Sequence, residues 1–289
     1  PALHTFTNRM RKGNRFTHGY DSISDSYYFL RKATLNDFAF IEEDNFELKQ
    51  IQKRFYQDLK LEPTYETIQG KSLTSNAIID STRSKKLHLQ TVFKRGDYYL
   101  MGVVTNQNEK AKAFFESFRI KNPEYHEEFV TVKDTALFFT TKTSVKPAKF
   151  VENSNNYFTG PNKPKPYSAF NKKTIYQNKN NEAIAVELNK SHDFLMFEHI
   201  DSVWALRKKI YADKRFNIVN ESCSTRPNGE HELNLTLTDT ASTRGILIKN
   251  IVKEGLLYEI KAKVDTANSP TKFIKEFFVN FQPIDTIIG

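Results

Sequence analysis

Two short polar clusters in the sequence contain the residue types that bind anions. Asp80 is followed closely by Arg83 and Lys85, and Asp239 is followed by Arg244. A guanidinium group presents a planar fork of N–H donors that matches a carboxylate or a phosphate, so the clusters predict two anion-binding sites. The competing interpretation, which the residue types favour, is a pair of polar turns whose Asp, Ser and Thr side chains hydrogen-bond the nearby backbone.

Other reactive residue types are scattered along the chain. His192 and Asp193 with Glu198 and His199 come nearest to a metal-binding cluster, but they flank an apolar run, and ordinary polar positions are the favoured interpretation. Cys223 is the only cysteine, which excludes an internal disulfide and a thiolate metal cluster, and no histidine adjoins it. The GxSxG, SxxK, P-loop and GxGxxG patterns do not occur. The sequence therefore predicts no catalytic residue, no metal and no cofactor.

The positive charge of the chain is concentrated in two segments. The formal net charge is +9 and the pI is about 9.3, which suggests nucleic acid or an anionic membrane as partner. Residues 1–20 contain four basic residues and no acidic one, and residues 142–180 contain eight lysines and one glutamate. The rest of the chain holds 31 basic and 33 acidic residues. Because the parts expected to fold are nearly neutral, and no RNP, KH or HTH signature occurs, nucleic acid is not the expected partner.

Residues 144–181 are rich in Asn, Lys and Pro and lack sustained helical or strand periodicity, which predicts a linker. The elements expected on its two sides follow one order, namely an amphipathic helix, several strands and a Phe-rich helix. The first helix lies within FELKQIQKRFYQDLKL in one half and within DSVWALRKKIY in the other. We therefore expect a basic tail over 1–24, an α+β domain over 25–143, the linker, and a second α+β domain over 182–289.

An internal repeat supports this division. At a constant offset of 159, residues 78–118 align without a gap with residues 237–277. Few residues are identical, but apolar residues coincide at every second position in the strands and at helical spacing in the last helix. Each domain is expected to be an antiparallel β-sheet with an amphipathic helix before it and a Phe-rich C-terminal helix packed on it. That arrangement buries the helix residues Phe114, Phe118, Phe273 and Phe277.

The tripeptide Arg95-Gly96-Asp97 lies between two expected strands, where it could be a receptor ligand or the corner of a hairpin. Its counterpart in the second copy is Glu254-Gly255-Leu256, so the glycine alone is shared. Glycine adopts positive φ without a steric penalty, which a tight hairpin turn requires. The repeat thus favours the hairpin, with Arg95 and Asp97 exposed beside the turn.

The first copy resembles a known family. The run KLHLQTVFKRGDYYLMGVV followed by AKAFFESF is similar to the strand, glycine turn, aromatic strand and closing helix of the PsbP-like α/β sandwich. The residues that carry the resemblance are Gly96, Tyr98, Tyr99, Phe114, Ser117 and Phe118. The Asn-, Lys- and Phe-rich composition is also similar to repeated extracytoplasmic modules of uncharacterised function from Bacteroidetes. The resemblance brings no catalytic motif and implies a binding or assembly module.

Three classes of function stay open. The first, which the duplicated domains and the missing catalytic motifs favour, is a non-catalytic binding or assembly module of a bacterial cell envelope, with a protein or an envelope component as partner. The second is a nucleic-acid or anionic-surface binder that uses the basic tail and linker. The third is an enzyme with a site in the cleft between the domains. No run of 18 apolar residues occurs, so we expect a soluble protein without a membrane span, in the periplasm or on the surface of a Gram-negative bacterium.

Overall fold

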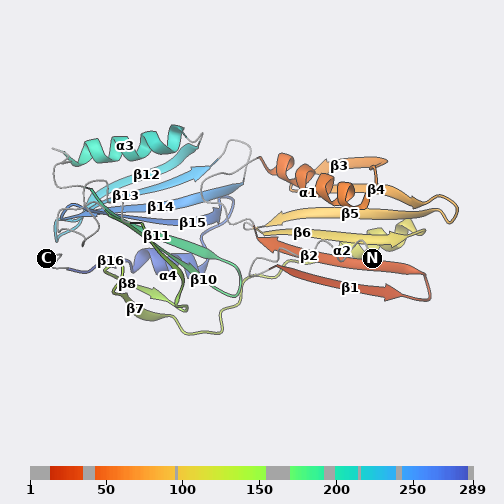
Figure 1. Cartoon of the computed structure of the whole chain (residues 1–289), viewed down its shortest axis with the longest axis horizontal. Helices are drawn as coiled ribbons and strands as arrows, with labels where there is room; N and C mark the ends of the chain where they lie inside the picture. The colour runs from red at the N-terminus through yellow and green to blue at the C-terminus, as the bar shows by residue number, and fades with distance from the viewer. Residues whose placement is uncertain are drawn as a thin grey trace, which may run out of the picture. The chain divides into compact units, whose positions relative to one another are not determined.

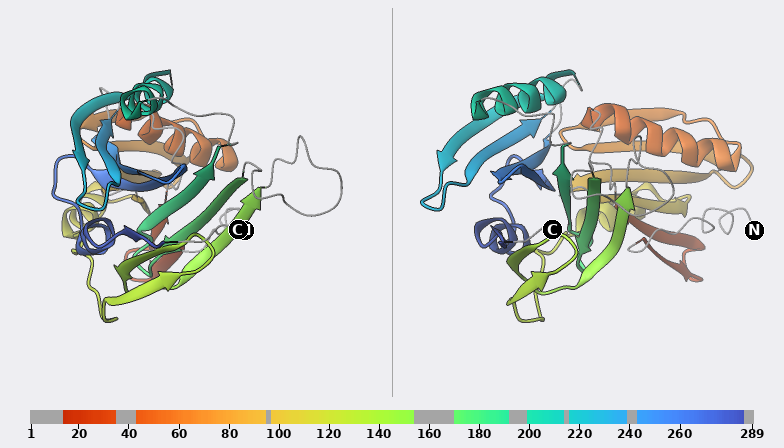
Figure 2. Two further views of the ribbon diagram at one scale, coloured as in Figure 1. Left: turned by 90° about the vertical axis from the view of Figure 1, so that its left-hand side faces the viewer. Right: turned by 60° about the vertical axis from the view of Figure 1, so that its left-hand side comes forward.

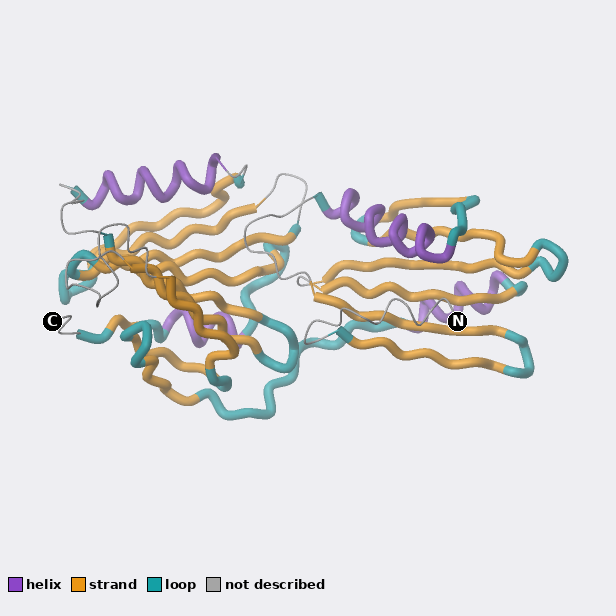
Figure 3. Tube along the Cα trace, viewed as in Figure 1, coloured by secondary structure: helices purple, strands orange, loops and turns teal. Residues whose placement is uncertain are grey.

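The computed structural model describes residues 14–34, 43–94, 97–153, 170–191, 199–213, 216–238 and 243–285. The chain divides into two compact units. Unit 1 comprises Pro1–Asn36 and Glu42–Asn122, and unit 2 comprises Asp37–Ile41 and Pro123–Gly289. Each unit is built on an antiparallel sheet with two described helices, so the expected α+β class is confirmed (Figure 1). Strands predominate in both units (Figure 3), and no described helix is long and apolar enough to cross a membrane.

Unit 1 contains a six-stranded sheet with the order β1-β2-β6-β5-β4-β3. Its strands are β1 (Arg15–Asp21), β2 (Ser26–Thr34), β3 (Tyr65–Gln69), β4 (Ser72–Asp80), β5 (Lys85–Lys94) and β6 (Asp97–Thr105). Helix α1 (Asp44–Leu59) packs on one face against β4 and β5, and helix α2 (Asn108–Ser117) packs on the other face against β6.

Unit 2 contains a seven-stranded sheet with the order β12-β13-β14-β15-β11-β10-β9. Its strands are β9 (Pro147–Asn153), β10 (Phe170–Gln177), β11 (Ala183–Lys190), β12 (Asn217–Thr225), β13 (His231–Thr238), β14 (Arg244–Lys253) and β15 (Leu256–Asp265). Helix α3 (Ile200–Asp213) packs on one face. The other face carries α4 (Lys272–Val279) and a small sheet of the order β16-β8-β7 (Figure 2). The strands of that small sheet are β7 (Val130–Asp134), β8 (Phe139–Thr143) and β16 (Gln282–Pro283).

Strand β5 shows how the sequence produces a sheet with two different faces. Successive side chains point to opposite sides of a strand, and every second residue of β5 is buried toward α1. These buried residues are Leu87, Leu89, Thr91 and Phe93. Helix α1 covers them because its own buried residues recur at helical spacing, as do Leu48, Gln52, Phe55 and Tyr56.

The two large sheets repeat one topology. Read from β3 to β1, the strand order of unit 1 matches the order from β12 to β10 in unit 2, where β9 adds a seventh strand. The first residues of β5 and β14 differ by the expected 159, and so do those of β6 and β15. Tyr99 and Tyr258 therefore lie in equivalent strands, which confirms the sequence alignment across these strands. At the turn between β14 and β15, Gly255 has the expected positive φ of 78°.

The alignment fails in the last helix. Helix α4 begins five residues later than the offset predicts from the start of α2. The helix therefore starts at a different point, but Phe114 and Phe118 still face the sheet, where their rings contact Tyr28 and Tyr99. Phe273 and Phe277 are fully buried in α4, whereas Phe114 is half-buried and Phe118, just past the end of α2, is half-buried too. The prediction of buried phenylalanines is confirmed for unit 2 and wrong for unit 1.

The structure places the boundaries between the parts differently from the sequence-based expectation. Strand β1 lies within the expected tail over 1–24, and β9 and β10 lie within the expected linker over 144–181. Unit 1 ends at Asn122, so β7 and β8 belong to unit 2. Composition concealed these strands: β10, FNKKTIYQ, has two lysines and an asparagine and buries only Thr174 and Tyr176.

Candidate functional site

The first predicted anion site, around Asp80, is a polar turn at the end of β4. Asp80 Oδ1 accepts hydrogen bonds from the backbone N–H groups of Thr82 (3.0 Å) and Arg83 (3.3 Å). The Thr82 hydroxyl and the Arg83 N–H lower the pKa of Asp80. The Arg83 side chain is 74% exposed with its Nε 3.8 Å from the Asp80 carboxylate, and Lys85 is paired with Asp25. The cations of this cluster are therefore already matched by carboxylates of the chain.

The remaining predicted residues do not assemble into a site. Asp239 lies outside the described residues, and Arg244 is the first residue of β14 and only 5% exposed. Of the expected metal cluster, His199 is described, whereas His192, Asp193 and Glu198 lie outside the described residues. The described residues contain no group of three His, Cys, Asp or Glu side chains that could hold a metal ion. Cys223 is exposed, and partial burial and the Glu221 carboxylate raise the pKa of its thiol, so it is not an activated nucleophile.

Asp97 corrects one expectation about the Arg-Gly-Asp tripeptide. Arg95 and Gly96 lie outside the described residues, but Asp97 begins β6 and is 7% exposed rather than exposed as expected. Its position between Thr34 of β2 and Lys94 of β5 holds it within the sheet. Asp97 Oδ2 lies 2.7 Å from Lys32 Nζ. The carboxylate that a receptor would need is therefore engaged within the fold.

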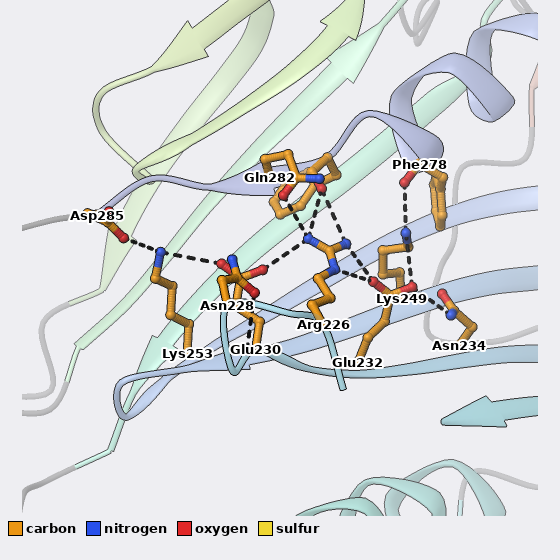
Figure 4. Close-up of polar contacts among 11 residues, drawn as sticks. Arg226, Asn228, Glu230, Glu232, Asn234, Lys249, Lys253, Phe278, Gln282 and Asp285 are labelled. Atoms are coloured by element: carbon orange, nitrogen blue, oxygen red, sulfur yellow. Dashed lines mark hydrogen bonds and ion pairs between the residues drawn. The ribbon is translucent and has the colours of Figure 1, made fainter. Parts of the chain in front are cut away.

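A cluster of six charged residues joins the β12–β13 hairpin to the chain that follows α4 (Figure 4). The Arg226 guanidinium lies between two carboxylates, with Nη1 3.0 Å from Glu230 Oε2 and Nε 3.0 Å from Glu232 Oε2. Lys249 Nζ lies 3.1 Å from Glu232 Oε1, and Lys253 Nζ lies 3.3 Å from Glu230 Oε1. This hairpin charge cluster consists of Arg226, Glu230, Glu232, Lys249, Lys253 and Asp285. Three cations match three carboxylates, so the cluster is neutral.

The hairpin charge cluster holds the C-terminal segment in place. Lys249 donates a 2.8 Å hydrogen bond to the carbonyl of Phe278, so the cluster is tied to the end of α4. Burial alone would raise the pKa of Glu232, but the Asn234 amide, Lys249 and Arg226 keep this pKa below its usual value. Buried charges that are paired in this way serve the packing of the unit, because removing one partner would leave an uncompensated charge.

A second buried cluster lies on the opposite face of the same sheet, beneath α3. Glu259 of β15 is 3% exposed, and Arg207, Tyr211 and Lys261 all contact its carboxylate. Tyr211 donates its hydroxyl hydrogen to Glu259, and burial raises the pKa of that hydroxyl. Asn250, which is fully buried, stands directly opposite Glu259 in the ladder between β14 and β15. Arg207 and Tyr211 attach α3 to the sheet through this carboxylate.

Exposed aromatic rings gather on the β1–β2 hairpin of unit 1. Alternation along β1 places three rings on one face, and the register of β2 places two more beside them. We call this set the β1–β2 aromatic face, and it consists of Phe16, His18, Tyr20, Tyr27 and Phe29. Among Phe16, His18, Tyr27 and Phe29, neighbouring ring centroids are between 5.7 and 6.3 Å apart, and Tyr20 stands directly opposite Tyr27 in the strand pairing. Phe29 is 2% exposed and Tyr20 is 62% exposed, so the face extends from the core to solvent.

The buried end of the aromatic face is anchored in the core of unit 1. The Phe29 ring stacks on Phe55 of α1 with centroids 5.4 Å apart, and it lies over Gly102 of β6. A Cβ at Gly102 would meet the Phe29 ring at 2.0 Å, so only glycine lets the ring lie there. At the outer end, the Tyr20 hydroxyl donates a 2.9 Å hydrogen bond to Asp25. Assigning residues 1–24 to a tail missed this surface, which the alternating rings of RFTHGYD signal.

Comparison with known proteins gives matches to solved structures only. No family model and no curated protein matches the chain. Cyanobacterial PsbP (CyanoP) from Synechocystis sp. PCC 6803 is similar at 9% identity and a TM-score of 0.35, over 57% of this chain and 98% of that one. The type VI secretion immunity protein TplEi from Pseudomonas aeruginosa is similar at 9% identity and a TM-score of 0.26, over 95% of this chain and 93% of that one. At these TM-scores neither match carries an argument about fold or function.

Proposed function

We propose that this protein is a non-catalytic binding module and that unit 1 binds a protein partner on the β1–β2 aromatic face. The observation that carries the proposal is the exposure of this face. Tyr20 is 62% exposed, His18 is exposed, and Phe16 and Tyr27 are half-buried. Aromatic clusters at a surface are typical of binding sites, since a ring buries a large apolar area while few torsion angles become ordered. The buried charge clusters of unit 2 serve packing, which is why we favour binding over catalysis.

The charge of the aromatic face favours a protein partner over a nucleic acid. Alternation turns Arg15 and Lys32 to the opposite side of the hairpin, so Arg31 is the one basic residue of β1 and β2 on the aromatic side. Nucleic-acid binding depends on several Lys or Arg side chains at phosphates. Tyrosine and phenylalanine rings with a few polar groups instead match the centre of a protein interface, where charged residues are depleted.

A photo-crosslinking amino acid tests this surface in the native bacterium. We expect a protein adduct when the crosslinker replaces Tyr20, and none when it replaces Thr17, which points to the other side of the same strand. With the purified partner, Tyr20→Ala combined with His18→Ala is expected to weaken binding about 30-fold or more, as truncating central aromatic residues costs about 2 kcal/mol or more. Thr17→Ala should bind as the parent does. Equal adducts at both positions, or binding that ignores the double substitution, would contradict the proposal.

The proposal also includes a location in a bacterial cell envelope, as the resemblance to repeated extracytoplasmic modules implies. Fractionation of the native bacterium, followed with an antibody to this chain, tests the location independently of the aromatic face. We expect the chain in the periplasmic or membrane-associated fraction. Recovery with cytoplasmic markers would contradict the location and leave the binding surface untouched.

A further inference from the structure

Strand β12 lies at an edge of the large sheet of unit 2 and is exposed on both faces. It is the first strand in the sheet order, and eight of its nine residues are exposed, with Ile218 partly buried. No described backbone hydrogen bond reaches its outer edge. An edge strand presents a row of backbone N–H and C=O groups whose natural complement is another extended strand.

The register of the hairpin shows which backbone groups point outward. The Arg226 N–H donates a 2.8 Å hydrogen bond to the Glu230 carbonyl, which makes these two residues a hydrogen-bonded pair. In an antiparallel ladder such pairs alternate with pairs that are not hydrogen-bonded to each other. Residues two and four positions before Arg226 therefore bond to β13, and the residues between them turn their backbone groups to the free edge. The outward-facing residues are Glu221, Cys223 and Thr225.

The opposite edge of the same sheet carries a residue that discourages pairing with another chain, and β12 does not. Strand β9, at the opposite edge of the same sheet, begins with Pro147, which has no backbone N–H to donate. Proline and lysine are common means of protecting an edge. Strand β12 has the sequence NIVNESCST, without proline or lysine. Its single charge, Glu221, is paired with Lys208 of α3 at 2.8 Å.

We propose that β12 binds an extended segment of a partner protein, which joins the sheet of unit 2 as an additional strand. Main-chain hydrogen bonds from the three outward-facing residues supply affinity, and alternate side chains supply specificity. Apart from two asparagines and Glu221, which is paired with Lys208, the side chains of β12 are small or β-branched, and Val219 is 50% exposed. An uncharged segment with small and β-branched residues fits these neighbours, since cross-strand pairs of such residues stabilise a sheet. This surface belongs to the other unit from the β1–β2 aromatic face and does not depend on it.

A phage-displayed library of random 12-residue peptides, selected on the full chain carrying Cys223→Ser, tests the proposal. The serine variant keeps the backbone N–H at position 223 and removes the thiol. We expect selected peptides to bind Cys223→Pro at least tenfold more weakly, because proline has no N–H to donate at the free edge. The N–H at position 223 does not bond to β13, so Cys223→Pro is expected to keep the thermal midpoint of the parent. Tyr20→Ala should leave peptide binding unchanged, which separates this test from that of the aromatic face.

Two further measurements test the proposal. If Cys223→Pro lowers the melting midpoint, Thr225→Pro provides the same test at the next outward-facing position. Hydrogen exchange should show that the peptide protects the amides of Glu221, Cys223 and Thr225. A library that yields no binder, peptides that bind the proline variants as well as the serine variant, or unprotected amides would each overturn the proposal. A dimer of the chain that Cys223→Pro dissociates would overturn the choice of partner.

Discussion

Units 1 and 2 share a strand order but cover equivalent sheet faces to different extents. Helix α4 of unit 2 has four buried residues, whereas α2 of unit 1 buries only Ala111. The small sheet accounts for the difference. Phe139 of β8 lies against Phe277 of α4 with ring centroids 6.3 Å apart, and the Thr141 hydroxyl of β8 donates a 2.7 Å hydrogen bond to the carbonyl of Phe277. Strand topology therefore does not determine how deeply the last helix is buried. The small sheet added in unit 2 buries side chains of α4 that would otherwise be partly exposed.

The two units also fill the opposite faces of their sheets with different polar chemistry. In unit 1, Gln52 donates a 2.8 Å hydrogen bond to the carbonyl of Leu73, and Tyr56 is 2.7 Å from the hydroxyl of Ser75. In unit 2, Arg207 and Tyr211 have the same spacing of four on α3 and both contact Glu259, as described above. Glu259 aligns with Leu100 of unit 1 at the offset of 159. The same sheet topology thus accommodates a neutral polar network beneath α1 and a charged one beneath α3.

The largest expected loss of stability follows from the deeper burial of α4 in unit 2 than of α2 in unit 1. Phe277→Ala is expected to lower the free energy of unfolding of unit 2 by about 3–5 kcal/mol, because it removes buried contacts and leaves a cavity. For a unit of this size the melting midpoint should fall by roughly 10 °C. Phe118→Ala, at the aligned position of unit 1, is the matched control and should shift the midpoint far less, since its ring is half-buried. Equal shifts would show that cover does not distinguish the units.

The second-largest effect is expected when the buried charged network of unit 2 is replaced with the residue types of unit 1. Glu259→Leu installs the residue of unit 1 at this position and leaves Arg207 and Lys261 without their buried carboxylate, which should cost about 3 kcal/mol. Adding Arg207→Gln, again the residue type of unit 1, should recover much of this loss. A double-mutant cycle from urea melts measures the coupling between the two positions. Additive losses would contradict the view that the two networks are interchangeable.

The sequence predicted the parts of the fold whose signals lie within single elements. The alternation in β5 and β14 and the shared turn at Gly255 identified the central strands and their repeat. The extra turn of chain before α4 was missed because an ungapped alignment cannot register a longer loop. Strand β1 lies at a sheet edge and β10 lies next to one. Both were missed because strands at or near an edge tolerate Lys, Asn and His, which obscure a period of two. The alternating rings of β1 are visible in the sequence, but the β1–β2 aromatic face also depends on pairing with β2 and on Gly102 of a third strand, which local sequence does not reveal.

The smallest expected effect is a difference between the units in acid. In unit 2, Glu232 is held by the hairpin charge cluster, and Glu187, whose pKa burial alone would raise, has its pKa lowered by Lys261 and Asn171. Because these folded-state pKa values lie below the ordinary value of about 4.5, the two carboxylates stabilise unit 2 above that pH and lose their contribution as the pH falls through the folded-state values. Among the described carboxylates of unit 1, Asp21, Asp25 and Asp80 have a lowered pKa, and these three lie at the surface, where solvent screens them. Hydrogen-exchange protection, corrected for intrinsic rates between pH 7 and pH 3, should therefore fall further in β13 and β14 than in β5 and β6. Glu232→Gln should reduce this difference, and an earlier loss of protection in unit 1 would refute it.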